Sequence, residues 1–197
     1  MSVAKRILLI RHGEVADAYR GRFVGKTDPP LSEEGRAACR SLRERVAALA
    51  PAKFYCSPLL RAVETLEAVG GVRSETVFDP RLCEINFGKW ENLLFDEIIH
   101  HADASPEQMR IWSEEPERFQ FPGGESYGLF AQRIDSFMRD LYKTPYPTVA
   151  MVTHGGILMR VISVWKGVPP SRQWENLPPR GSLAVYDWKD GEAVYVE

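Results

Sequence analysis

The chain has 197 residues, of which 44% are hydrophobic and 26% are charged, and its net charge is −2 at pH 7. This length suits one ordinary domain, and the near-neutral charge argues against nucleic acid as a partner. The three cysteines lack the spacing of a disulfide framework or a metal site, so they predict reduced thiols in a cytoplasmic protein. No stretch approaches the ~20 apolar residues of a membrane span, and we expect neither a membrane partner nor a metal or other cofactor.

The first element is an apolar strand over Ile7–Ile10, which ends in Arg11, His12, Gly13 and Glu14. A buried parallel strand delivers its last residues to the carboxyl edge of its sheet, where open α/β folds bind ligands. Gly13 permits a sharp turn directly after the histidine. A cation and an imidazole at this edge form a candidate anion site, although one histidine after a strand can also be a buried structural imidazole.

The segment Val15–Pro30 is rich in Gly, Pro, Asp and Arg, which predicts a loop over this edge. Within it, residues Gly21–Thr27 nearly match a phosphate-binding P-loop. The first glycine is one position too close, and the prolines that follow forbid the helix that a P-loop must open. The segment therefore does not predict a site for a nucleoside triphosphate.

Ser32 is a candidate N-cap for an amphipathic helix over Glu33–Leu49. A short strand over Lys53–Cys56 follows, and the Ser-Pro pair at 57–58 has the order of a helix start. Arg61 then lies one turn inside that helix, near the same sheet edge as the first histidine. This position favours a role in the site over an exposed arginine on a helix face.

A weak strand is expected at Glu75–Phe78, and Glu84 follows between apolar neighbours. Such a setting tends to raise the pKa of a carboxyl group, which suits a general acid, although a solvated loop glutamate is the alternative. Residues 91–124 predict helices at Glu91–Ala102 and Pro106–Glu114. Because this stretch is long for a crossover, we expect a small helical cap over the sheet edge.

A helix is expected over Ser126–Tyr142, behind a turn rich in glycine. Several aromatic residues in and near the cap either line a pocket for a leaving group or form the core of the cap. These aromatic residues are Trp90, Trp112, Phe121 and Tyr127.

A second apolar strand, Thr148–Thr153, ends in His154 and Gly155 and leads into an apolar helix over Ile157–Trp165. Two such junctions in a chain with four histidines favour one shared site over two separate packing residues. Residues 182–188 and 193–197 predict a closing hairpin. The order of strands and helices indicates an α/β fold with a mostly parallel sheet.

These residues carry a resemblance to the histidine phosphatase superfamily, whose best-known branch is the phosphoglycerate mutases. Arg-His-Gly-Glu at 11–14 and His-Gly at 154–155 resemble its first and last motifs. The segments at 21–35, 56–62 and 82–91 resemble the family's intermediate motifs and the segment that follows its first motif. The resemblance therefore covers nearly the whole chain. It implies a three-layer α/β/α sandwich with a mixed sheet, and one histidine phosphatase domain over residues 1–197 with the cap as an insertion.

The resemblance also implies residue roles. His12 is the nucleophile that becomes phosphohistidine, and Arg11, Arg61 and His154 bind the phosphoryl oxygens. Glu84 protonates the leaving alcohol and then takes a proton from the attacking water. The same residues would therefore carry both halves of the reaction.

Gly155, Arg22 and Gly25 are further candidates for the phosphate site. The family usually has asparagine four residues after its first motif, as a phosphate contact, where this chain has Ala18. Another side chain must take over that role. The candidates are Tyr19, Arg20 and Arg22.

The third motif separates mutases from phosphatases. Mutases are longer and typically have Glu-Arg-His-Tyr-Gly where residues 84–88 of this chain are Glu-Ile-Asn-Phe-Gly. The pattern Glu-x-x-Phe-Gly-x-Trp-Glu, followed later by Pro-Gly-Gly-Glu-Ser, is similar to α-ribazole-5'-phosphate phosphatases of cobalamin assembly. We therefore expect metal-independent hydrolysis of a small phosphorylated metabolite through phosphohistidine.

Several alternatives stay open at this point. The chain can be a broad-specificity or sugar-phosphate phosphatase, a phosphoglycerate mutase, or a binding module that has lost catalysis. The motif residues that such modules usually lose are present here, which favours an enzyme. The oligomeric state is also open, with a homodimer as one option.

Overall fold

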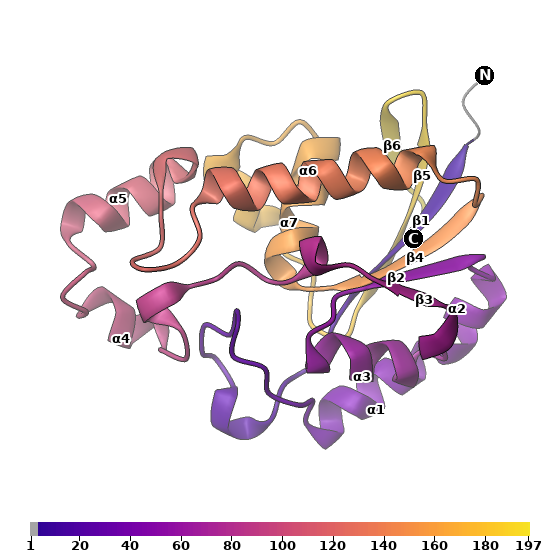
Figure 1. The fold of residues 1–197 in the computed structure, drawn as a ribbon, viewed down its shortest axis with the longest axis horizontal. Coiled ribbons are helices and arrows are strands. Elements are labelled where there is room, and N and C mark those ends of the chain that lie inside the picture. The colour runs from indigo at the N-terminus through magenta and orange to yellow at the C-terminus, as the bar shows by residue number, and fades with distance from the viewer. Residues whose placement is uncertain (1–3) are drawn as a thin grey trace.

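The computed structural model describes residues 4–197 and contains a six-stranded sheet (Figure 1). In chain order, the strands are β1 (Lys5–Arg11), β2 (Lys53–Cys56), β3 (Thr76–Phe78), β4 (Thr148–Thr153), β5 (Leu183–Lys189) and β6 (Glu192–Tyr195). Their spatial order is β3-β2-β4-β1-β5-β6. The pairs among β1 to β4 are parallel, whereas β5 pairs antiparallel with both β1 and β6. The expected mixed, mostly parallel sheet is confirmed.

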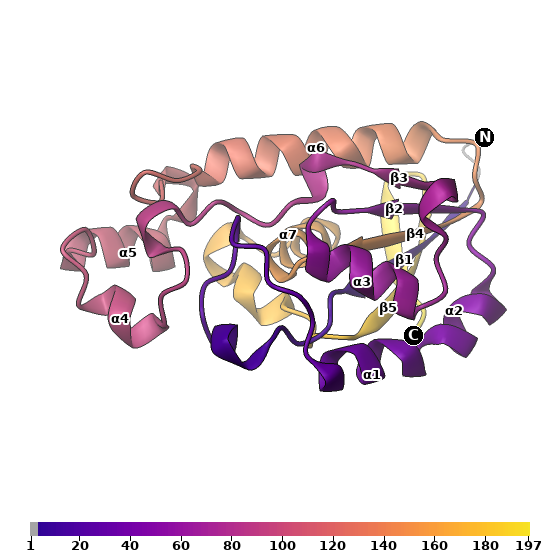
Figure 2. The same ribbon diagram turned by 60° about the horizontal axis from the view of Figure 1, so that its bottom comes forward.

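Helices cover both faces of this sheet. In chain order, they are α1 (Glu33–Ser41), α2 (Arg43–Leu49), α3 (Leu60–Ala68), α4 (Phe95–Ile99), α5 (Pro106–Glu114), α6 (Tyr127–Lys143) and α7 (Gly155–Trp165). Helices α1 to α3 lie on one face and α6 and α7 on the other, while α4 and α5 lie beyond the carboxyl ends of the strands (Figures 1 and 2). The three-layer α/β/α arrangement is confirmed.

Short 3-10 helices join these elements. In chain order, they are η1 (Asp17–Tyr19), η2 (Arg73–Glu75), η3 (Pro80–Leu82), η4 (Gly88–Trp90), η5 (Pro116–Arg118) and η6 (Pro170–Asn176). The segment η6 packs against α7, so it brings the chain back to the carboxyl edge of the sheet before β5 begins.

The side chains of β1 divide between two hydrophobic cores, because successive residues of a strand point to opposite faces. Ile7 and Leu9 pack into the core beneath α6 and α7, and Leu8 and Ile10 pack into the core beneath α1 to α3. All four side chains are at most 1% exposed. Burial on both faces is the physical reason for the continuous apolar run in this strand.

The structure corrects two helix predictions. The predicted helix over Glu33–Leu49 is divided at Leu42, whose N–H donates to the carbonyl three residues earlier in a 3-10 turn. Helix α3 begins at Leu60 and not at the Ser-Pro pair at 57–58. The Asp28 carboxylate accepts a hydrogen bond from the Leu60 N–H at 2.7 Å, so a residue from another loop caps this helix.

Two other local predictions have different outcomes. The helix predicted over Glu91–Ala102 is reduced to α4, because Asn92 has a φ of 61° and turns the chain before the helix begins. The hairpin is confirmed, and its turn residues Asp190 and Gly191 have φ values of 52° and 93°. Positive φ at both positions is what a two-residue turn between antiparallel strands requires.

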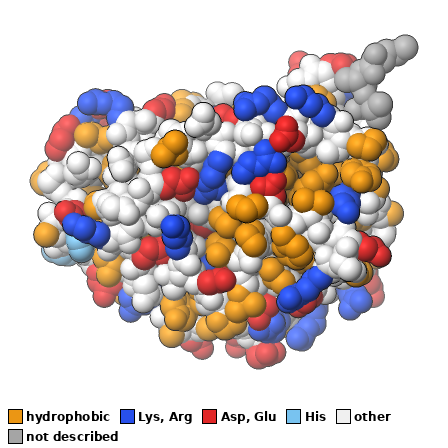
Figure 3. Space-filling view, in the orientation of Figure 1, with side chains coloured by type: hydrophobic (Ala, Val, Ile, Leu, Met, Phe, Trp, Pro, Cys, Tyr) orange, Lys and Arg blue, Asp and Glu red, His pale blue; other side chains and the backbone are white. Residues whose placement is uncertain are grey.

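Charged side chains of both signs are interspersed on the face shown in Figure 3, and hydrophobic side chains lie between them. This mixture agrees with the net charge of −2. Within residues 4–197, no helix has the length and apolar character that a bilayer crossing needs.

Replacing Ile134 by alanine should lower the free energy of unfolding by about 2–5 kcal/mol, because it leaves a cavity in the core between α6 and the sheet. Ile134 is 1% exposed, whereas Leu129 on the same helix is 61% exposed. Leu129→Ala is therefore the matched control and should change this free energy by less than about 0.5 kcal/mol. Urea unfolding of both variants measures the difference, and equal losses would contradict the packing of α6.

Candidate active site

The carboxyl ends of β1 and β4 and the N-terminus of α7 meet at a cavity of about 480 Å³. The expected site residues that line it include Arg11, His12, Glu84 and Gly155. His154 is the N-cap of α7, and its ring centroid lies 5.1 Å from that of His12. The fold therefore brings the two strand-histidine-glycine junctions together, as expected.

His12 is held as a neutral imidazole with one nitrogen available. Its Nδ1 lies 2.7 Å from the carbonyl oxygen of Gly13, and since a carbonyl only accepts, Nδ1 carries the proton. The lone pair is then on Nε2. Burial, and after it the charge of Arg61, hold the pKa of His12 well below its ordinary value. A neutral imidazole with a free Nε2 is the form that can attack phosphorus.

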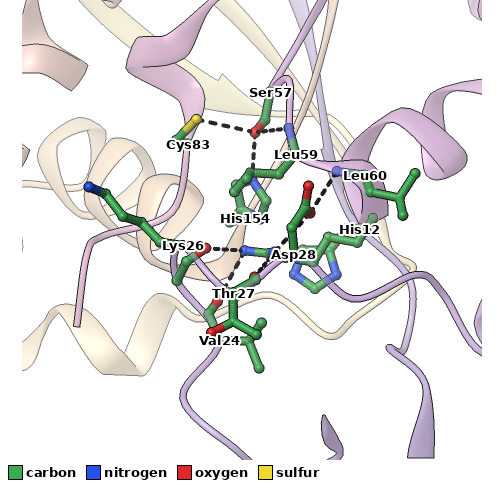
Figure 4. Close-up of polar contacts among 12 residues, drawn as sticks. His12, Val24, Lys26, Thr27, Asp28, Ser57, Leu59, Leu60, Cys83 and His154 are labelled. Atoms are coloured by element: carbon green, nitrogen blue, oxygen red, sulfur yellow. Dashed lines mark hydrogen bonds and ion pairs between the residues drawn. The ribbon is translucent and has the colours of Figure 1, made fainter. Parts of the chain in front are cut away.

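His154 is fully buried, and its Nε2 lies 2.7 Å from the Oγ of Ser57 (Figure 4). Burial also holds the pKa of His154 well below its ordinary value. The Ser57 hydroxyl accepts a hydrogen bond from the Leu59 N–H at 3.3 Å and lies 3.9 Å from the Sγ of Cys83. Ser57 therefore belongs to the site, a role that its expected place at a helix start did not indicate.

Arg61 is fully buried behind the loop that covers the site. Its guanidinium donates hydrogen bonds to the carbonyl oxygens of Val24 at 3.0 Å, Gly25 at 2.9 Å and Thr27 at 2.9 Å. Asp28 lies 3.6 Å away as an ion-pair partner. These contacts use Nη1 and Nη2, and Nε is left without a partner.

Among the described residues, three buried side-chain nitrogens without a hydrogen-bond partner belong to expected site residues. They are Nε of Arg11, Nε of Arg61 and Nδ1 of His154. Buried polar groups in folded proteins are almost always paired, so their concentration around His12 indicates a place for a ligand. Guanidinium N–H groups suit the oxygens of a phosphoryl group. The arrangement therefore fits an oxyanion beside His12.

Glu84 lies in the same cavity and accepts two backbone hydrogen bonds. Its Oε2 accepts from the N–H of Gly156 at 3.0 Å, and its Oε1 accepts from the N–H of Ile85 at 3.0 Å. The first of these bonds places the carboxyl group at the N-terminus of α7, on the same side of the sheet edge as His12. Its expected role as a proton donor stays a prediction.

Arg180 is a residue of the cavity that sequence reasoning missed. Its guanidinium forms an ion pair with Glu14. Burial, and after it the charge of Arg180, lower the pKa of Arg11 to about 10, so Arg11 stays charged at neutral pH. Arg180 follows two prolines in a stretch without a motif, and nothing in the local sequence identifies it as a site residue.

Two further phosphate candidates have protein partners. Arg22 lines the cavity, but its guanidinium donates to the Asn92 carbonyl at 2.8 Å and pairs with Glu97 at 3.1 Å. The expectation for Gly25 is corrected, because its N–H donates to Glu91 Oε2 at 3.1 Å and is not free to bind a phosphate.

Three residues close to Ala18 in sequence were candidates for the role of the family's asparagine. Arg20 forms an ion pair with Asp17 at 2.8 Å, with 55% of its side chain exposed. Within the described residues, neither Arg20 nor Tyr19 lines the cavity, whereas Arg22 does. Of the three candidates, Arg22 alone lies in the right place.

The outer wall of the cavity is aromatic. Among the residues that form it are Phe23, Phe87, Trp112, Phe119, Phe121 and Tyr127. Trp90 is fully buried behind this wall, with its ring centroid 5.4 Å from that of Trp112. The sequence left open whether four aromatic residues line a pocket or form the core of the cap. Trp112, Phe121 and Tyr127 line the cavity, whereas Trp90 and Phe121 belong to the hydrophobic core, so Phe121 does both. Such a wall suits an apolar or aromatic group attached to the oxyanion.

Comparison with known proteins gives consistent matches. The family model described as the histidine phosphatase superfamily (branch 1) matches residues 7–197. Phosphoserine phosphatase 1 of Hydrogenobacter thermophilus is 31% identical over 98% of this chain and 90% of its own length. The adenosylcobalamin/alpha-ribazole phosphatase of Escherichia coli is 28% identical over 92% of this chain and 89% of its own length. The crystal structure of the alpha-ribazole phosphatase from Shigella flexneri is 26% identical and aligns with a TM-score of 0.85. The alignment covers 97% of this chain and 94% of the Shigella chain.

The free energy of unfolding should fall as the pH is lowered below about 6.5. His12 and His154 stay neutral in the folded protein, whereas in the unfolded chain they regain ordinary pKa values near 6.5. The unfolded state then binds more protons, so stability declines by at most about 1.4 kcal/mol per pH unit for each histidine. Urea unfolding at about pH 7.5, 6.5 and 5.5 measures this slope.

The controls for this prediction are single substitutions. His154→Asn should flatten the slope below about pH 6.5, since it removes one of the two groups that protonate only on unfolding. His100→Asn, at an exposed position after α4, should leave the slope unchanged. If His154→Asn retained the full slope, the neutral state of His154 in the folded protein would be contradicted.

Proposed function

The chain belongs to the histidine phosphatase superfamily and is a phosphatase, and we propose that His12 carries the phosphoryl group during hydrolysis of phosphomonoesters. The observation that carries this proposal is the set of unpaired buried nitrogens around a neutral imidazole. A phosphoryl group offers them acceptor oxygens, and two guanidinium groups supply positive charge without a metal.

In the first half of the proposed reaction, His12 Nε2 attacks phosphorus in line with the ester oxygen. A P–N bond forms and the P–O bond to the leaving group breaks, while Glu84 gives its proton to the leaving oxygen. In the second half, Glu84 takes a proton from water, the hydroxyl attacks phosphorus, and phosphate leaves His12. Arg11 and Arg61 hold the equatorial oxygens in both halves.

His154 joins these donors if the proton on its ring is at Nδ1. A hydrogen bond donated by the Ser57 hydroxyl to Nε2 would fix that tautomer, and the distance of 2.7 Å supports such a bond. Nδ1 is then a buried N–H donor without a protein partner, as the phosphoryl group needs.

We assign the aromatic-walled part of the cavity to the leaving group. α-Ribazole 5'-phosphate, a substrate of cobalamin assembly, joins its phosphate to a ribose that carries a benzimidazole ring. Aromatic rings pack favourably edge-to-face or offset, and Trp112 and Phe121 offer such surfaces. The names of the enterobacterial relatives support this substrate.

Phosphoserine is the second candidate, because the Hydrogenobacter relative is named for it and two arginines besides Arg11 line the cavity. A carboxylate would need one of these cations to be free. Arg180 is paired with Glu14, and Arg22 is paired with Glu97. We therefore place the aromatic substrate first.

We also propose a cytoplasmic location, since Cys39, Cys56 and Cys83 are all free thiols that a reducing compartment would preserve. Residues 91–124 are proposed as a cap insertion in a single domain. A homodimer, and a small metabolite rather than nucleic acid or a membrane as partner, stay predictions.

Phosphate release in the presence of EDTA should be fastest, at low substrate concentration, from α-ribazole 5'-phosphate. Phosphoserine, 3-phosphoglycerate, fructose bisphosphate and methyl phosphate complete the panel. Trp112→Ala should raise the KM for the ribazole ester about tenfold, the loss expected for one aromatic contact of about 1.4 kcal/mol. The same variant should hydrolyse phosphoserine as the wild type does.

Two controls accompany this panel. Phe95→Ala removes an aromatic side chain that is 50% exposed, and it should leave every KM unchanged. His12→Asn should abolish release from all substrates. A wild-type preference for phosphoserine would favour the second candidate, and no release from any substrate would contradict the proposal.

Glu84→Gln should affect esters according to their leaving groups. The ribazole ester leaves as an alkoxide that needs a proton, so its cleavage should slow by about 100-fold or more. p-Nitrophenyl phosphate leaves as a stable phenolate and should still give a rapid burst of about one nitrophenolate per active site. Later turnover should be slow, because the water that attacks phosphohistidine lacks its base. If the substitution slowed the cleavage of both esters by the same factor, the role of Glu84 as a general acid would be contradicted.

A further inference from the structure

Glu91, the first residue of the helical cap, accepts five hydrogen bonds, and four of them come from the loop over the site. It is the last residue of the Glu-x-x-Phe-Gly-x-Trp-Glu motif and takes no part in the chemistry above. Its carboxylate accepts from the backbone N–H groups of Gly25, Lys26 and Thr27 at 3.1, 2.8 and 3.1 Å. It also accepts from the Thr27 hydroxyl at 2.9 Å and from the Phe87 N–H at 3.1 Å. A carboxylate has about four acceptor positions, so this one is saturated.

Backbone carbonyl groups of the same loop are bound to Arg61. The carbonyl oxygens of Val24, Gly25 and Thr27 accept hydrogen bonds from its guanidinium at 2.9–3.0 Å. Within residues 24–27, three of the four N–H groups therefore donate to a carboxylate and three of the four carbonyl groups accept from a guanidinium. Each charged side chain needs the loop in one position to keep its own bonds.

Gly25 allows the carboxylate to come this close. A Cβ atom at this position would lie 2.4 Å from Oε1 of Glu91 and 2.1 Å from the carbonyl oxygen of Ile85. No larger residue fits without displacing one of these segments. The glycine that sequence analysis assigned to phosphate binding thus serves the contact between the loop and Glu91.

We infer that Glu91 is a positioning residue for phosphoryl binding, acting through residues 24–27 on Arg61. The carbonyl groups of the loop hold Nη1 and Nη2 of Arg61, and this fixes the orientation in which Nε has no protein partner. Without the carboxylate, the N–H groups of the loop lose their acceptor and the carbonyl groups move with them. Arg61 then loses the orientation that presents Nε to the phosphoryl oxygens. The inference rests on the proposed function.

Glu97 offers a matched control. It also joins this loop to the cap, through an ion pair with Arg22 at 3.1 Å, and within the cap it accepts a hydrogen bond from the Leu94 N–H at 2.7 Å. Its hydrogen bonds do not involve residues 24–27 or Arg61. A general loosening of the cap would follow from loss of either glutamate, whereas an effect on phosphoryl binding should follow from loss of Glu91 alone.

The test compares Glu91→Gln and Glu97→Gln with the wild type. Inorganic orthovanadate serves as a probe, because it resembles the phosphoryl group in the transition state. Glu91→Gln should raise the Kd for vanadate at least tenfold and lower kcat for p-nitrophenyl phosphate at least tenfold. Glu97→Gln leaves residues 24–27 and Arg61 in place and releases Arg22 beside the cavity, so it should not raise the vanadate Kd. Thermal unfolding identifies temperatures at which every variant is folded.

A double-mutant cycle separates positioning from a structural role. In an Arg61→Lys background there is no guanidinium to orient, so Glu91→Gln should raise the vanadate Kd less than threefold further. Independent structural losses would instead multiply, and a full second tenfold loss would overturn the inference. If Glu91→Gln does not fold, Glu91→Asp keeps the charge but withdraws the oxygens by one methylene group, and it should weaken vanadate binding at least threefold.

The outcomes for the two proposals differ. A wild type that neither binds vanadate nor releases phosphate would overturn the proposed function and this inference with it. An active wild type with unchanged vanadate binding in Glu91→Gln, or in Glu91→Asp if only that variant folds, would overturn the inference alone.

Discussion

The site depends on the burial of cationic and imidazole groups at one edge of the sheet. Arg61 and His154 are fully buried and His12 is 6% exposed, so a further positive charge among them would be costly. The imidazoles therefore stay neutral, and the charge of Arg61 is met by backbone carbonyl groups and by Asp28. A neutral nucleophile beside donors that lack partners is the condition in which a phosphate ester is attracted and attacked.

The rest of the fold maintains that condition. Strands β1 and β4 are neighbours in the sheet, and this pairing places the two histidines side by side. Val24 of the loop lines the cavity, and the aromatic residues Trp112, Phe119 and Phe121 of the cap form part of its outer wall. Surroundings of low dielectric strengthen each interaction between the donors and an oxyanion. Packing far from the histidines thus contributes to their chemistry.

The sequence predicts the strands, the two histidine junctions and the hairpin, because each has a local pattern: an apolar run, a glycine turn, or a pair of turn residues. It did not predict the contact of Ser57 with His154, the place of Arg180, or the contact of Gly25 with Glu91. These contacts join segments that are distant in sequence, and the local sequence around one partner does not predict the other partner. The break at Leu42 was also missed, since the apolar spacing continues across it.

The chemistry and the choice of substrate come from different parts of the chain. His12, His154 and Glu84 come from strand ends and from the segment held against the N-terminus of α7, where the backbone of the sheet fixes them. The walls of the proposed leaving-group site come from the loop before α1, the cap and η6, which contact the sheet edge without being part of it. Substitutions in these walls can change the leaving group without moving the nucleophile. Relatives named for phosphoserine and for α-ribazole can therefore share one fold, and the aromatic wall of this chain, more than its catalytic groups, argues for an aromatic substrate.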